Sequence, residues 1–203
     1  MTLVKICGIC SVEDAVATAA AGADLLGFHF CPSRRRVSTD AAVAMVKALD
    51  ARRPQLVGVF IDPSEDLVRE VSRDVGLDLV QLHGSESPAF AASRPVLKAL
   101  KVRDGEVPDP AAWPDPLLLD SWTADGRGGS GEAWDWSAGR ELIARRRVFL
   151  AGGLTPANVG PAVRRFRPYG VDVSSGVERD VRRKDPDLVR AFLQAVRDAD
   201  AEG

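Results

Sequence analysis

Eight short apolar segments recur along this chain, and mostly polar segments separate them at regular intervals. Near-continuous apolar strands that alternate with helices are typical of a parallel sheet covered on both faces. Eight such units favour a closed (β/α)₈ TIM barrel, with a doubly wound open sheet as the alternative architecture. The expected strands are residues 3–7, 23–30, 55–61, 77–83, 95–102, 116–121, 147–153 and 169–175.

Most of the intervening segments show apolar residues at helical spacing behind a side chain that can cap a helix. Residues 103–115 differ, because they are rich in Pro and Asp and leave little room for a full helix. The fifth helix of the barrel should therefore be shortened or irregular. The other segments predict helices over residues 12–23, 39–52, 64–76 and 155–166, capped by Ser11, Thr39, Ser64 and Thr155.

Length and charge narrow the class of protein. A chain of 203 residues with 45% hydrophobic content can bury one core, so we expect a single barrel domain over residues 1–203. The net charge of -2, with both signs interleaved, disfavours nucleic acid and membranes and favours a small-molecule partner. With three sparse cysteines, no leader-like start and no apolar run of about 18 residues, we expect a cytoplasmic protein with free thiols.

Polar residues gather where the expected strands end. In a barrel these ends and the loops that follow them carry the catalytic groups. The side chain of Lys5 should also face the barrel interior, because it lies two residues before Cys7 on the same strand. A buried ammonium needs a partner, and Asp172 is the candidate carboxylate. The strand ends read Cys7-Gly8, Gln81-Leu82-His83-Gly84, Asp120-Ser121, Gly152-Gly153 and Asp172-Val173-Ser174-Ser175-Gly176.

The series of motifs resembles the phosphoribosylanthranilate isomerase family nearly from end to end. Its members are VKICGI, ADLLGFHF with S-x-R-x-V, VGVF, QLHG, LLLDS, GGSG with WDW, LAGGLTPANV and GVDVSSGVE. The resemblance implies a TIM barrel that performs an Amadori rearrangement in tryptophan biosynthesis. It implies no cofactor and no metal, a phosphosugar substrate, and a monomer or a homodimer.

The resemblance also implies roles for individual residues. It makes Cys7 the general base and Asp120 the general acid, and it places Arg35 at the anthranilate carboxylate and Asp172 near the anthranilate amino group. Arg34 and Arg36 are alternatives to Arg35, while His83 is either a substrate contact or a structural hydrogen-bonding residue. The resemblance assigns the substrate phosphate to three loops that contain glycines, and barrels commonly bind phosphate in such loops. These loops contribute Gly129, Ser130, Gly131, Gly152, Gly153, Ser174, Ser175 and Gly176.

The ordinary pKa values of cysteine and aspartic acid determine what Cys7 and Asp120 would need in order to act as base and acid. A thiol with a pKa of about 8.5 is roughly one-tenth thiolate near pH 7.5, and a neighbouring cation raises that fraction. An ordinary aspartic acid, with a pKa of about 3.9, is almost wholly ionised at neutral pH. A carboxyl group that acts as the acid therefore needs burial or neighbouring negative charge.

Other interpretations of the same residues remain open at this stage. Cys7 and Cys10 form a C-x-x-C pair that could be redox-active, or could join Cys31, His29 and His83 in a zinc site. His29 lies in a strand that is apolar on both sides and is expected to serve packing. Residues 179–183 lack the glycine that the family has in its final loop. A related barrel epimerase, an isomerase of histidine biosynthesis and an inert phospho-ligand-binding barrel are the alternative functions.

Overall fold

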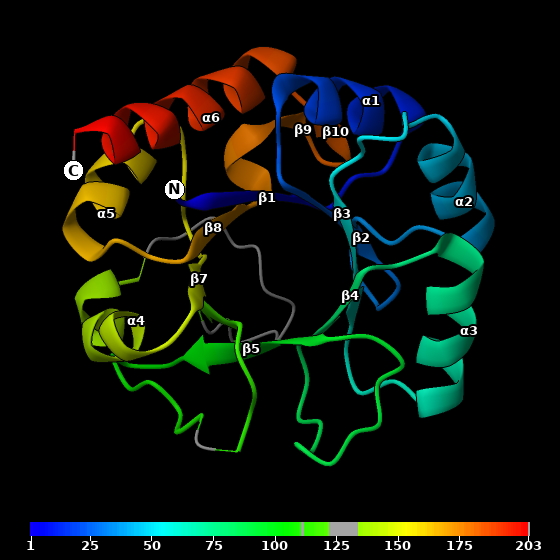
Figure 1. Cartoon of the computed structure of the whole chain (residues 1–203), viewed down its shortest axis with the longest axis horizontal. Coiled ribbons are helices and arrows are strands. Elements are labelled where there is room, and N and C mark those ends of the chain that lie inside the picture. The colour runs from blue at the N-terminus through cyan, green and yellow to red at the C-terminus, as the bar shows by residue number, and fades with distance from the viewer. Residues whose placement is uncertain (111, 122–133, 203) are drawn as a thin grey trace.

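A computed structural model describes residues 1–110, 112–121 and 134–202. Eight parallel strands, neighbours in the order of the chain, close into a barrel that Figure 1 shows end-on. Closure comes from pairing of the first strand with the last, with Lys5 opposite Asp172. The predicted TIM barrel is confirmed and the open-sheet alternative is wrong. The strands are β1 (Leu3–Cys7), β2 (Leu25–His29), β3 (Gln55–Phe60), β4 (Leu79–Leu82), β5 (Val96–Val102), β6 (Leu117–Ser121), β7 (Val148–Leu150) and β8 (Gly170–Val173).

Helices pack around the barrel, most of them where the sequence predicts. Ser11 caps the first helix, since its side chain accepts a hydrogen bond from the Asp14 N–H. Two expected caps are wrong: Ser38 rather than Thr39 caps the helix at Thr39–Lys47, and the helix at Val159–Phe166 begins after Asn158 instead of Thr155. The helices are α1 (Val12–Ala21), α2 (Thr39–Lys47), α3 (Glu65–Val75), α4 (Arg140–Arg145), α5 (Val159–Phe166), α6 (Pro186–Ala201) and the 3₁₀ turns η1 (Trp136–Gly139) and η2 (Ser175–Val177).

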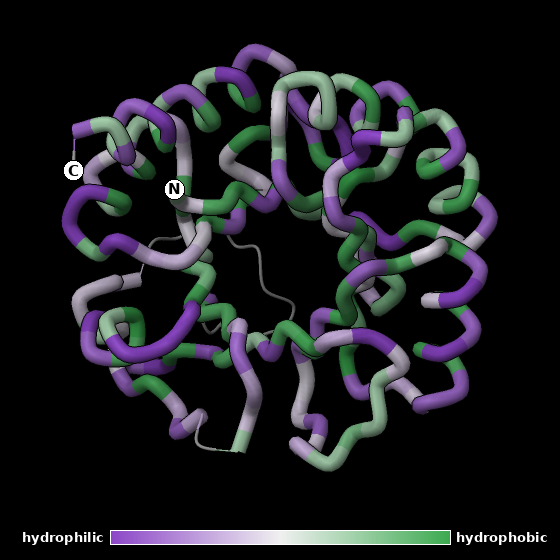
Figure 2. The backbone as a smooth tube through the Cα atoms, in the orientation of Figure 1, coloured by the Kyte–Doolittle hydropathy of each residue, from purple (hydrophilic) through white to green (hydrophobic). Residues whose placement is uncertain are grey.

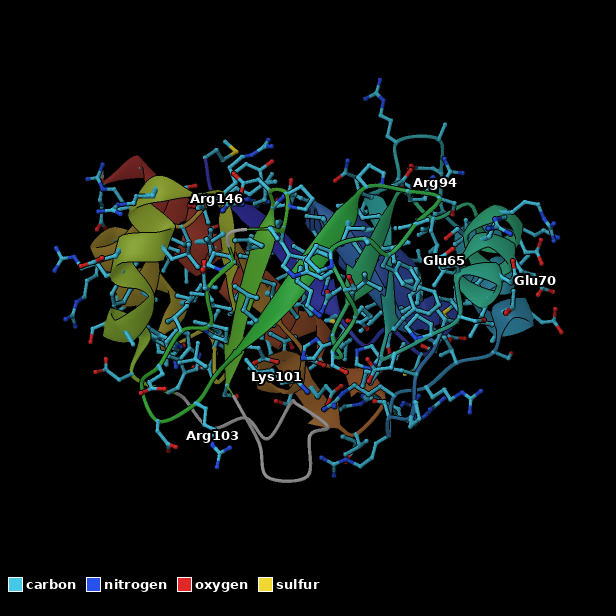
Figure 3. All side chains as sticks on the ribbon, turned by 90° about the horizontal axis from the view of Figure 1, so that it is seen from below. Glu65, Glu70, Arg94, Lys101, Arg103 and Arg146 are labelled. Carbon is cyan, nitrogen blue, oxygen red and sulfur yellow. The ribbon has the colours of Figure 1, made fainter. Side chains whose placement is uncertain are left out.

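One side of the barrel wall has no helix outside it in the part of the chain that the structure describes. The expected irregularity after β5 is present, and the segment after β4 also lacks a helix. β5 consequently faces the viewer uncovered in Figure 3. On this side the Lys98 ammonium donates to Glu86 Oε2 and to the Gly84 carbonyl, each at 2.6 Å, and lies 5.1 Å from the ring centroid of Trp113.

The strands bury two layers of side chains. The outer face of most strands packs against the helices, and the inner face fills the barrel interior with Leu25, Val57, Leu79, Leu97, Ala99, Leu118, Phe149 and Ala151. Figure 2 shows the strands as a largely hydrophobic ring. Because side chains alternate along a strand, the interior face continues to Cys7, Gln81, Asp120 and Asp172 at the carboxyl ends. No helix among the described residues is both long and apolar enough to cross a membrane.

Candidate active site

A cavity opens at the carboxyl ends of the barrel strands, and it brings the predicted site residues together. Gly129, Ser130 and Gly131 lie outside the described residues. Every other residue predicted for the site lines the cavity. These are Cys7, Arg35, His83, Asp120, Gly152, Gly153, Asp172, Ser174, Ser175 and Gly176.

Cys7 ends β1 and points its thiol into this cavity. Burial raises the pKa of the thiol, and the positive charge of Lys5 opposes that effect. The other cysteine of the C-x-x-C motif is engaged elsewhere, since Cys10 Sγ lies 3.4 Å from the carbonyl oxygens of Gly8 and Arg35. The two thiols therefore have different surroundings, and only Cys7 lines the cavity.

Lys5 lies beneath Cys7 and is fully buried inside the barrel. Its ammonium donates a hydrogen bond to Asp172 Oδ1 at 2.8 Å, which confirms the partner that alternation along the strand predicts. Burial alone would lower the pKa of Lys5, but the attraction of Asp172 and Cys7 outweighs it and raises that pKa. A permanent positive charge consequently stands next to the thiol.

Asp120 ends β6, and its carboxyl group is buried in the cavity wall. Its Oδ1 accepts a hydrogen bond from the Ser121 N–H at 2.8 Å, and its Oδ2 lies 3.4 Å from His83 Nε2. His83 Nδ1 lies 3.1 Å from Gln81 Nε2. His83, just beyond β4, therefore lies between Gln81 and the predicted acid and lines the cavity.

The loops after β7 and β8 form one wall of the cavity. Gly152 and Gly153 have φ values of 82° and 75°, a left-handed backbone that glycine adopts without strain. A side chain at Gly176 would place its Cβ 2.0 Å from the Leu154 carbonyl oxygen, so these two loops touch through backbone atoms. The Ser174 hydroxyl is buried and has no hydrogen-bond partner among the described residues. This wall offers an anion a free hydroxyl and closely packed backbone.

Arg35 is the arginine of the 34–36 run that reaches the cavity, whereas Arg34 and Arg36 are exposed. Its Nε and Nη2 donate to the two oxygens of Glu178 at 2.7 and 2.6 Å, and the Lys184 ammonium donates to the same carboxylate at 3.0 Å. Burial by itself would raise the pKa of Glu178, but the two cations hold it below its ordinary value. Sequence reasoning missed this pairing, because Glu178 is 143 residues from Arg35 and no local pattern links the two.

Glu178 belongs to a short hairpin in the final loop, formed by β9 (Glu178–Asp180) and β10 (Arg183–Lys184). Arg182 takes the left-handed turn position with φ 75°, although that conformation favours glycine. Its guanidinium donates to the carbonyl oxygens of Arg34 and Arg36. These bonds tie the hairpin to the loop that carries Arg35.

His29 is a correction to the sequence-based interpretation, which assigned it to packing. It ends β2 and lines the cavity, with its Nε2 3.2 Å from Cys7 Sγ and its Nδ1 3.0 Å from Ser33 Oγ. Burial, together with the nearby charge of Lys5, lowers the pKa of His29 to about 3. The position at a strand end was the available signal, since the same rule selected Cys7 and Asp120.

Within the described ranges, no group of three or more His, Cys, Asp or Glu side chains could hold a metal ion. The cavity instead offers two thiols, two carboxyl groups, two imidazoles and several backbone amides. Such a set can move protons and bind an anion.

Comparison with known proteins places this site in context. A family model described as N-(5'-phosphoribosyl)anthranilate (PRA) isomerase matches residues 4–195. The N-(5'-phosphoribosyl)anthranilate isomerase of Geobacter sp. (strain M21) is 46% identical over 200 residues, covering 95% of this chain and 97% of that protein.

Two solved structures are also similar. The phosphoribosyl anthranilate isomerase of Thermus thermophilus is 38% identical with a TM-score of 0.88, covering 97% of this chain and 99% of that one. A second phosphoribosyl anthranilate isomerase, in complex with reduced 1-(o-carboxyphenylamino)-1-deoxyribulose 5-phosphate, is 33% identical with a TM-score of 0.82. That likeness covers 98% of this chain and all of the other.

Proposed function

The chain belongs to the N-(5'-phosphoribosyl)anthranilate isomerase family, and on that premise we propose how its own residues carry out the reaction. The substrate is N-(5-phosphoribosyl)anthranilate and the product is 1-(2-carboxyphenylamino)-1-deoxyribulose 5-phosphate, formed by an Amadori rearrangement in tryptophan biosynthesis. The observation that carries the proposal is that Cys7 and Asp120, from β1 and β6, line one cavity. The product analogue in the solved relative supports the same ligand class.

Asp120 acts as the general acid. It donates a proton to the ribose ring oxygen, so that the bond from this oxygen to C1′ breaks and a Schiff base forms with the anthranilate nitrogen. Its burial and its place at the strand end suit this role; the Ser121 N–H donates to its Oδ1, and His83 Nε2 lies 3.4 Å from its Oδ2. A positioned acid or base of this kind contributes about 10² to 10⁴ in rate.

Cys7 acts as the general base. Its thiolate takes the proton from C2′, the electron pair of the C–H bond neutralises the Schiff base, and the resulting enolamine rearranges to the ketone. The burial that raises the pKa of the thiol limits the thiolate fraction, and the ammonium of Lys5 partly restores it. Lys5 therefore supports the base without contacting substrate.

The substrate carries two anionic groups, and the cavity contains a candidate partner for each. The phosphate suits the wall built by Gly152, Gly153 and residues 174–176, where the Ser174 hydroxyl is unpaired among the described residues. The anthranilate carboxylate suits Arg35, because its guanidinium has further N–H groups besides the two that donate to Glu178. Asp172, held by Lys5, is then placed for the anthranilate amino group.

The test compares the two cysteines of the same motif. Cys7→Ser should reduce turnover of phosphoribosylanthranilate, followed by loss of its fluorescence, by about 10² to 10⁴, because a hydroxyl is a far weaker base than a thiol. Cys10→Ser is the matched control and should stay active, since Cys10 contacts carbonyl oxygens and not the cavity. Substrate should protect Cys7 from alkylation. Equal loss in both variants, or an active Cys7→Ser enzyme, would overturn the assignment of Cys7.

A further inference from the structure

The thiol of Cys7 meets a histidine that the reaction as described leaves unused. Cys7 pairs in register with Gly27, and a side chain at Gly27 would put its Cβ 2.7 Å from Cys7 Sγ. The missing side chain leaves that space to the thiol. Cys7 Sγ reaches across it to the next inward position of β2, where His29 Nε2 lies 3.2 Å away. Both atoms border the cavity.

The other ring nitrogen of His29 has a partner that suits the tautomer with the hydrogen on Nε2. Ser33 Oγ lies 3.0 Å from His29 Nδ1 and accepts a hydrogen bond from the Arg35 N–H at 3.1 Å. With that backbone donor already on its oxygen, the Ser33 hydroxyl can give its own hydrogen to Nδ1. Nδ1 then accepts, and the ring hydrogen lies on Nε2, directed at Cys7 Sγ.

Burial, and after it the surrounding charges, keep this imidazole neutral. Lys5 from β1, His83 beyond β4, Arg35 and Lys184 all face His29 and disfavour a second cation, in the same direction as its burial. The groups that face Cys7 are Lys5, Asp172, Lys184 and His29. A histidine in this position cannot accept the proton of the thiol, but it can donate a hydrogen bond to the sulfur.

We propose that His29 is a positioning residue for Cys7, donating its Nε2–H to the sulfur so that the thiolate is favoured over the thiol. The proposal rests on Cys7 as the base of the proposed function. Hydrogen bonds to a charged atom are roughly twice as strong as those between neutral groups, so the bond favours the ionised sulfur. Lys5, on the same strand as Cys7, contributes a positive charge. His29, on the neighbouring strand, contributes a hydrogen-bond donor directed at the sulfur.

The experiment measures the pKa of Cys7 directly, without turnover. The rate of iodoacetamide reaction at Cys7 is followed against pH by peptide mass spectrometry in the substrate-free enzyme. His29→Leu removes the donor and should raise the pKa of Cys7 by about one unit, which is about tenfold less thiolate at neutral pH. His29→Gln, whose amide can donate from a similar place, should recover most of that shift. Ser33→Ala should cause a smaller shift in the same direction.

Val59 offers a matched control, because it lies against Cys7 in the same buried cluster without a polar contact. Val59→Ala should leave the pKa of Cys7 within a few tenths of the wild-type value. An unchanged pKa in His29→Leu, or an equal shift in His29→Leu and His29→Gln, would overturn the role of His29 as a donor. If His29→Leu does not fold, an unchanged pKa in Ser33→Ala has the same consequence.

The pH dependence of kcat/KM separates this proposal from the one on which it rests. If the pKa of Cys7 and the pH–rate profile move together in the variants, both proposals are supported. If the alkylation pKa moves while the pH–rate profile does not, the hydrogen bond from His29 stands and Cys7 is not the base.

Discussion

Substituting either member of the buried ion pair Lys5–Asp172 should lower the free energy of unfolding. The two substitutions should do so by different amounts. The side chain of Lys5 is 0% exposed, whereas that of Asp172 is 11% exposed and borders the cavity. Lys5→Met leaves Asp172 with access to water, while Asp172→Asn leaves an ammonium with none. Loss of one partner of a buried ion pair typically costs about 3–5 kcal/mol. We therefore expect Asp172→Asn to lower the free energy of unfolding more than Lys5→Met does.

The penalty on Asp172→Asn has an upper bound. An unpaired Lys5 can lose its proton instead of staying charged, and taking a lysine with a pKa of about 10.4 to its neutral form at pH 7 requires about 4.6 kcal/mol. The double variant Lys5→Met, Asp172→Asn contains neither charge. Its loss of stability should be smaller than the sum of the two single losses by about 2 kcal/mol or more.

Urea unfolding at pH 7, with equal slopes required for all four proteins, measures these differences. The pH dependence follows from the raised pKa of Lys5 in the folded enzyme. Stability from this pair is fully present below the unfolded pKa of about 10.4 and is lost as the pH rises through the higher folded value. The wild-type protein should thus lose this contribution only above about pH 10. A gap between wild type and Asp172→Asn that already narrows between about pH 7 and pH 10 would show that Lys5 is neutral in folded Asp172→Asn. Additive losses, or a Lys5→Met variant less stable than Asp172→Asn, would refute this reasoning.

Three further outcomes can be checked on the same protein. Asp120→Asn should keep substrate affinity while turnover falls by about 10² to 10⁴, and turnover within a few-fold of wild type would remove Asp120 as the acid. Sulfate at many millimolar should raise the melting temperature and compete with substrate, with chloride at equal ionic strength as the control; no difference between the two salts would argue against a preformed phosphate site. Gly176→Ala forces its Cβ within 2.0 Å of the Leu154 carbonyl oxygen, so it should destabilise the enzyme by about 1–3 kcal/mol and weaken the sulfate effect. A wild-type melting temperature for that variant would contradict the close approach of the two loops.

The sequence predicted the barrel and much of the cavity because both follow from local rules. Apolar runs mark strands, and polar residues at their carboxyl ends mark the site, which is how Cys7, His83, Asp120 and Asp172 were found. Alternation along one strand was enough to place Lys5 inside the barrel, and the need of a buried ammonium for a carboxylate identified its partner.

What the sequence did not predict depends on contacts between distant segments. The pairing of Arg35 with Glu178 and Lys184 joins the loop after β2 to a hairpin near the C-terminal end, and no periodic pattern encodes that approach. His29 was misassigned because its apolar neighbours suggested packing. Its contact with Cys7 needs the register of two adjacent strands, and in particular the empty position at Gly27.

The uncovered side of the barrel affects how sequence variation among relatives should be interpreted. Outside β5, where the described residues form no helix, Lys98 and Glu86 form an ion pair with side chains 6% and 2% exposed in the place of an apolar layer. Two buried charges of this kind should be inherited together, because losing either one leaves the other unpaired. Where relatives keep both residues, the pair reflects the packing of this side of the barrel and not a role in the reaction.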